Sequence, residues 1–127
     1  MANTNLIDSY QVDGSSNPVR LKVTVGNGQT GCIGVSIDGN DVIKPGADAN
    51  NNYTDSFDFE IGSNQDLNSS LLTIPVVVTR VQTDTQTTTV IVELTGGPTP
   101  SNYPPLTENA TNVGDIINYL CTIDFGN

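Results

Sequence analysis

Residues 71–94, LLTIPVVVTRVQTDTQTTTVIVEL, form the longest apolar and β-branched stretch of the sequence, so any fold of this chain must bury it. Apolar residues alternate with others in two segments, as Leu72, Ile74, Val76 and Val78 in the first and Val90, Val92 and Leu94 in the second. A period of two is typical of strands with one buried face. Polar residues 82–86 separate the two segments, and the pattern therefore predicts a central β-hairpin.

Both phases of this stretch are partly apolar. If the alternating set faces the core, Leu71, Val77, Val81 and Ile91 face outward. Exposed apolar patches usually mark an interface, which predicts a homo-oligomer. Pro75 cannot donate to a strand ladder, so it indicates a bulge or an edge strand. A bulge there would swap the phase, and a loop covering the second face would then replace the interface.

The rest of the chain alternates short apolar segments with clusters of Gly, Asn, Asp and Pro. Further strands are expected at residues 5–12, 19–25, 33–37, 42–43 and 57–61. Residues 95–108 contain four prolines and predict a long extended loop. The spacing favours a single antiparallel β-sandwich domain over residues 1–127, jelly-roll or Ig-like, with about seven to nine strands and little or no helix.

The C-terminal segment has two interpretations. Asn112 and Asp115 have the spacing of a helix cap ahead of Ile116, Ile117 and Leu120. Alternation of apolar residues from Ile117 to Phe125 predicts a strand instead, and this is the interpretation that we favour.

Composition and charge exclude several partners. Charged residues make up 14% of the chain and the net charge is −10, which repels nucleic acids and anionic lipid. The sequence has no apolar run of about 20 residues and no signal-peptide pattern at its start, so no membrane insertion is expected. In composition the chain resembles the Asn/Thr/Gly-rich β-sandwich modules of extracellular, adhesin, lectin and virus-particle proteins, which implies an extracellular or particle-associated location.

The two cysteines, Cys32 and Cys121, fall on opposite phases of their predicted strands. A disulfide needs Cα atoms within about 7 Å and converging Cβ vectors. The sequence therefore predicts two buried, free thiols.

Catalytic motifs are absent from the sequence. The chain has no histidine, which excludes histidine-based nucleophilic devices and histidine-ligated metals. Gly26, Gly28 and Gly31 match a dinucleotide-binding pattern, but another strand and not a helix is expected after them. We expect a protein that is not an enzyme; a hydrolase with two carboxylates is a third class that composition leaves open.

Oxygen donors gather between residues 38 and 58. The candidate ligands of a calcium ion are Asp38, Asn40, Asp41, Asp48, Asn50 and Asp55. The same residue types are the ordinary residues of β-turns, which is the competing explanation. Tyr53 and Tyr103 are the aromatic residues in predicted loops and the candidate contacts for a sugar.

These observations predict a non-enzymatic binding or assembly module, oligomeric with itself or bound to another protein. The alternative is a calcium-assisted, lectin-like carbohydrate-binding domain with a glycan as its partner.

Overall fold

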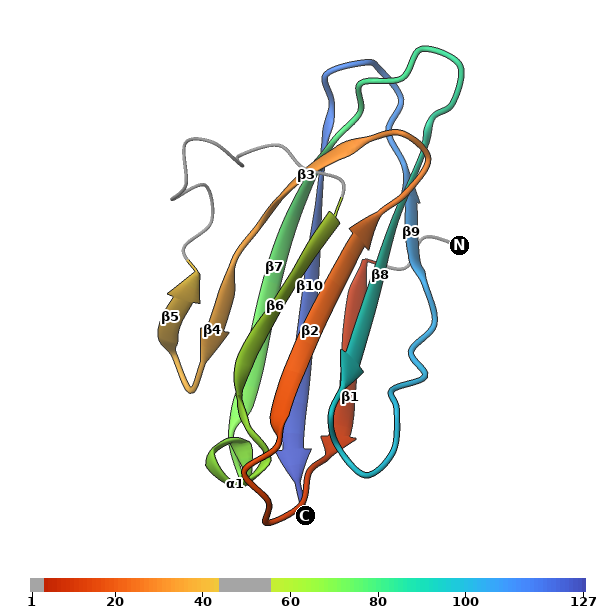
Figure 1. The fold of residues 1–127 in the computed structure, drawn as a ribbon. Helices are drawn as coiled ribbons and strands as arrows, with labels where there is room; N and C mark the ends of the chain where they lie inside the picture. Colours follow the sequence, from red (N-terminus) through yellow and green to blue (C-terminus); the bar gives the residue numbers. More distant parts are fainter. Residues whose placement is uncertain (1–3, 44–55) are drawn as a thin grey trace.

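The computed structural model describes residues 4–43 and 56–127, which form two β-sheets packed face to face (Figure 1). One sheet has six strands and the other has four, and the predicted all-β sandwich is confirmed. The strands of the described residues are β1 (Asn5–Gln11), β2 (Pro18–Val25), β3 (Thr30–Ile33), β4 (Val35–Ile37), β5 (Asn40–Ile43), β6 (Ser56–Ser63), β7 (Leu71–Thr79), β8 (Thr87–Thr95), β9 (Leu106–Asn109) and β10 (Ile116–Gly126). The expected strand at residues 33–37 is divided in two at Gly34, and β9 overlaps the end of the loop predicted at residues 95–108. The number of strands therefore exceeds the expected seven to nine.

The six-stranded sheet has the order β1-β10-β7-β4-β5, with β3 also paired to β7, and the four-stranded sheet has the order β6-β2-β8-β9. All pairs are antiparallel except β1 with β10, which are parallel. A purely antiparallel sandwich was expected. The two ends of the chain provide this pair, so no short hairpin connection constrains their relative direction.

The predicted hairpin of residues 71–94 is wrong. Its two arms are β7 and β8, and they lie in different sheets. Each arm has a fully buried inward face, because each contributes to the same core from opposite sides. Residues 80–86 cross from one sheet to the other at the end of the sandwich.

Two buried polar side chains hold this crossing in place. The Oε1 atom of Gln29 accepts hydrogen bonds from the backbone N–H groups of Val81, at 2.7 Å, and Gln82, at 3.1 Å. The guanidinium of Arg80 donates to backbone carbonyls of both neighbouring loops, those of Gln82, Thr83, Ala110 and Thr111. Contacts with residues outside the predicted hairpin, those of Gln29 and those of Arg80 with Ala110 and Thr111, therefore help to determine where this segment turns.

Pro75 lies in a central strand, and neither a bulge nor an edge accounts for it. The burial of β7 alternates without interruption, so the phase does not swap at Pro75. The carbonyl of Pro75 accepts from the N–H of Gly34 at 2.9 Å, at the break between β3 and β4. The missing proline donor thus coincides with an interruption in the neighbouring strand.

The C-terminal segment is the strand β10, as favoured above, and it lies between β1 and β7. Its inward residues, Ile117, Tyr119, Cys121, Ile123 and Phe125, belong to or pack against one hydrophobic core shared by both sheets. The helix of the described residues is the short α1 (Asn64–Leu67). Its start is capped by the Oγ of Ser63, which accepts from the N–H of Asp66.

The proline-rich connection between β8 and β9 packs beside β1. The hydroxyl of Tyr103 donates to the carbonyl of Ser9 at 2.9 Å, and the N–H of Gly97 donates to the hydroxyl of Tyr10 at 2.9 Å. This loop therefore satisfies part of the free edge of β1, which is how natural proteins protect an edge strand.

Candidate interaction surface

The two outer faces of the sandwich differ in charge. On the four-stranded sheet the outward residues of β2, β6 and β8 include five charged side chains, which we call the charged face: Arg20, Lys22, Asp58, Glu60 and Glu93. Lys22 lies opposite Asp58 on one neighbouring strand and Glu93 on the other. Arg20 forms an ion pair with Asp58 at 3.0 Å, with about half of each side chain exposed, at 50% and 51%. Opposite charges therefore alternate across this face, as on an ordinary solvated sheet.

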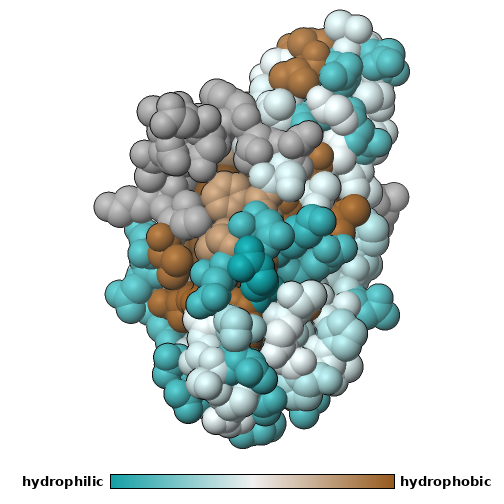
Figure 2. Space-filling model, viewed as in Figure 1, coloured by the Kyte–Doolittle hydropathy of each residue, from teal (hydrophilic) through white to brown (hydrophobic). Residues whose placement is uncertain are grey.

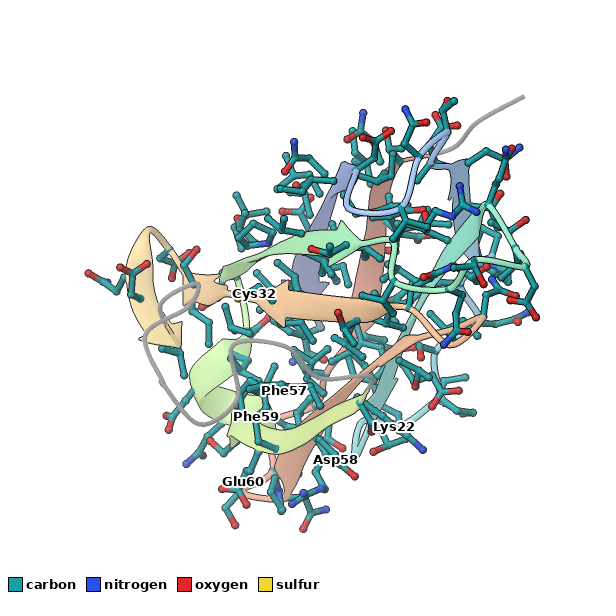
Figure 3. All side chains as sticks on the ribbon, turned by 90° about the horizontal axis from the view of Figure 1, so that it is seen from above. Lys22, Cys32, Phe57, Asp58, Phe59 and Glu60 are labelled. Atoms are coloured by element: carbon teal, nitrogen blue, oxygen red, sulfur yellow. The ribbon has the colours of Figure 1, made fainter. Side chains whose placement is uncertain are left out.

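Charged and aromatic residues alternate along β6, which places its charges on the outer face. Figure 3 shows Asp58 and Glu60 on one side of the strand and Phe57 and Phe59 on the other. The two aromatic rings pack edge to face against each other, with centroids 5.2 Å apart, and against the core. Figure 2 shows the hydrophilic side chains gathered over β2 and β6, which lie in front in Figure 1.

Among residues 4–43 and 56–127, no charged side chain lies at the centre of the outer face of the six-stranded sheet. The uncharged outward residues of β1, β3, β7 and β10 that lie inside the row of Asp124 are called here the neutral face: Asn5, Ile7, Thr30, Cys32, Thr73, Pro75, Val77, Thr79, Ile116, Asn118, Leu120 and Thr122. The acidic residues near it are at its rim, with Asp124 toward the end of β10 and Asp41 on β5. Short hydroxyls, amides and aliphatic side chains therefore form one continuous surface.

Strand pairing arranges the neutral face in rows. Leu120 lies between Asn5 and Pro75 in one row, and Val77 lies between Asn118 and Cys32 in the next. Three aliphatic side chains are well exposed, Ile7 at 81%, Ile116 at 57% and Leu120 at 43%. Large apolar side chains left in water on adjacent strands are a feature of interaction surfaces.

The sequence indicated only part of this surface. Leu71 and Val77 do face outward on the six-stranded sheet, Ile91 faces outward on the other sheet, and Val81 lies exposed in the crossing between them. Ile116 and Leu120 were missed as surface residues, although they lie on the phase opposite to the inward set of β10. Only the pairing of β10 with β7 shows that these residues share one face.

Both cysteines are free thiols. Cys121 points into the core, and burial raises the pKa of its thiol to about 12. Cys32 is on the opposite phase, as predicted, but it is only partly buried, because that phase is the outer face of the sheet.

The proposed calcium ligands are only partly described. Asp38, Asn40 and Asp41 lie in and after the turn between β4 and β5, while Asp48, Asn50, Asp55 and also Tyr53 lie outside the described residues. Asp38 has a positive φ of 53°, and its carboxylate accepts from the N–H of Leu71 at 2.9 Å. Turn chemistry therefore occupies one of these carboxylates. No group of three His, Cys, Asp or Glu side chains suited to a metal occurs within 4–43 and 56–127, and calcium binding stays a prediction.

Tyr103, the second predicted sugar contact, packs partly against the core. Burial is the main cause that raises the pKa of its hydroxyl, and the charge of Asp8 and the neighbouring Tyr10 add to it. Its hydroxyl is already bonded to Ser9. A glycan contact at Tyr103 also stays a prediction.

The fold and the two faces together define a β-sandwich domain with one charged and one neutral exterior. No family model, curated protein or solved structure matches this chain. Among the described residues, no helix is both long and apolar enough to cross a membrane.

Proposed function

We propose that this chain is a non-enzymatic binding or assembly module that contacts a protein partner through the neutral face. The observation that supports this proposal most is the segregation of charge between the two outer faces. A chain with a net charge of −10 has a sheet face without charge at its centre, and its exposed residues there include Ile7, Ile116 and Leu120.

Protein interfaces have this character. Their centres are depleted in charged residues, while apolar side chains are buried and polar groups find partners at the rim. The neutral face has aliphatic residues on adjacent strands, hydroxyl and amide groups among them, and acidic residues at its rim. The charged face lacks this pattern, because charged residues lie at its centre, with Arg20 paired to Asp58 and Lys22 opposite Asp58 and Glu93.

Site-specific photo-crosslinking tests the proposal. A photoreactive residue replaces Asn118 on the neutral face, and a matched variant has it at Thr24 on the charged face. Both positions are outward on strands, so neither substitution disturbs the core. In an extract of the producing cells, we expect discrete protein adducts from position 118 and none from position 24. Equal adducts from both positions, or none from either, would contradict the proposal.

A further inference from the structure

We infer that the partner of the neutral face is a second copy of this chain, packed face to face about a two-fold axis. The inference rests on the proposed function and specifies its partner. The charge and the hydrogen-bonding groups of the neutral face favour this occupant, and its area is sufficient for a weak dimer.

Charge is the first reason. Each charge buried in a two-fold interface must lie opposite a charge of the other sign, and desolvated unpaired charges are costly. The charged face could meet its own copy only by desolvating five charged side chains, including the ion pair of Arg20 with Asp58. The neutral face meets its copy without burying a charge, since Asp124 and Asp41 are at its rim.

Self-complementary polar groups are the second reason. A two-fold interface brings the same patch of both copies together, with residue i against residue j and j against i, so one patch must supply both donors and acceptors. The hydroxyls of Thr73 and Thr122 and the amide of Asn118 each donate and accept hydrogen bonds. The polar groups of the neutral face therefore need no group of a different kind from the partner.

The area of the face is sufficient for a weak dimer. The four strands β1, β3, β7 and β10 have 7, 4, 9 and 11 residues and lie about 4.8 Å apart, which gives a flat area of roughly 500 Å² for each copy. A specific interface buries at least about 1,000 Å² in total, or about 500 Å² on each partner, so this face is at the lower limit. Two copies of one sheet also have the same twist, which allows the aligned packing of β-sandwich sheets at about 30°. We therefore expect a dimer that forms at micromolar concentration.

Salt dependence distinguishes this dimer from one held by ion pairs. Each copy has a net charge of −10, so the copies repel each other at low ionic strength. Salt at 0.1 M reduces the screening length to about 10 Å. Added sodium chloride should therefore strengthen the dimer, whereas it would weaken an interface built from opposite charges.

The test measures the dissociation constant by sedimentation over a range of protein and salt concentrations. Leu120→Lys and Asn118→Lys place a charge at the centre of the neutral face, and Ile91→Lys places the same charge on an aliphatic position of the other sheet. All three changes reduce the net negative charge equally, so global repulsion cannot explain a difference between them. Circular dichroism checks that each variant is folded. If Leu120→Lys does not fold, Asn118→Lys, at an exposed polar position, still tests the neutral face.

We expect the wild-type dimer to tighten with salt, the two neutral-face variants to raise Kd at least tenfold, and Ile91→Lys to leave it unchanged. Alkylation of Cys32 gives a second measure of dimerisation in the unmodified protein. Because the dimer covers Cys32, its alkylation should slow as the protein concentration rises through Kd. A dimer that both neutral-face variants leave intact would overturn the inference. A wild-type chain that is monomeric at high micromolar concentration would overturn it too, while adducts of another protein at position 118 would still support the proposed function.

Discussion

Cys32 and Cys121 lie on the two strands that flank β7 and point to opposite sides of the same sheet. Cys121 is opposite Ile74, on the buried phase, and Cys32 is opposite Val77, on the outward phase. The geometry that prevents a disulfide therefore also gives the two thiols different access to solvent.

The two thiols should react at very different rates. In dilute native protein we expect one thiol to be alkylated rapidly and a second only after denaturant is added, because Cys121 has no exposed surface. Mass spectrometry of the alkylated peptides identifies the modified residue. The Cys32→Ser variant should lose the rapid phase. Simultaneous modification of both thiols in the native protein would show that the register of β10 or β3 is wrong.

Alkaline pH should destabilise the protein through Cys121. Burial raises the pKa of this thiol from 9.0 to about 12, so the unfolded chain releases the proton before the folded protein does. The contribution of the thiol to stability is complete below pH 9 and is lost as the pH rises from 9 to about 12. Over this range the free energy of unfolding falls by at most about 1.4 kcal/mol per pH unit for one group. Burial raises the pKa of Tyr119 as well, which acts in the same direction.

Denaturant unfolding measured between pH 8 and 11 tests this effect. The Cys121→Ala variant is less stable at neutral pH because it loses packing, but its stability should fall less steeply with pH than that of the wild type. Parallel curves for the two proteins would argue against a buried thiol as the cause.

Strands were predictable from this sequence, and their partners were not. Alternation located the two arms of residues 71–94 correctly, because a buried strand face has a local signature. The assignment of the arms to one hairpin failed because hydrogen bonds between residues distant in sequence, from Arg80 to Ala110 and from Val81 to Gln29, direct residues 80–86 to the other sheet. Among the central residues of the neutral face, the sequence pattern marked only Val77 as an outward apolar residue. Leu120 was missed, because only the pairing of β10 with β7 places it on this face.

Replacing Arg80 by lysine should destabilise the fold strongly. The guanidinium of Arg80 is 6% exposed and donates four hydrogen bonds to backbone carbonyls, a fork-shaped geometry that an ammonium cannot reproduce. We expect a loss of about 2–4 kcal/mol in the free energy of unfolding, because buried carbonyls lose a charged donor. The matched control is Arg20→Lys, at an exposed ion pair, where the loss should be below about 0.5 kcal/mol. Urea unfolding of both variants measures the difference, and similar losses would mean that Arg80 has no special role in the crossing.

Two glycines with positive φ should differ in their tolerance of a side chain. Gly96 has a φ of +101° and Gly114 a φ of +95°, so alanine is strained at both positions. A Cβ atom on Gly96 would overlap the carbonyl oxygen of Pro18, whereas one on Gly114 would have no heavy atom within 4 Å. We expect Gly114→Ala to cost about 1–2 kcal/mol, from backbone strain alone. Gly96→Ala should cost more than about 4 kcal/mol or prevent folding, because the backbone at the start of β2 must move. Thermal unfolding followed by circular dichroism compares the two variants. Equal melting temperatures would mean that the loop after β8 does not approach Pro18 as closely as described.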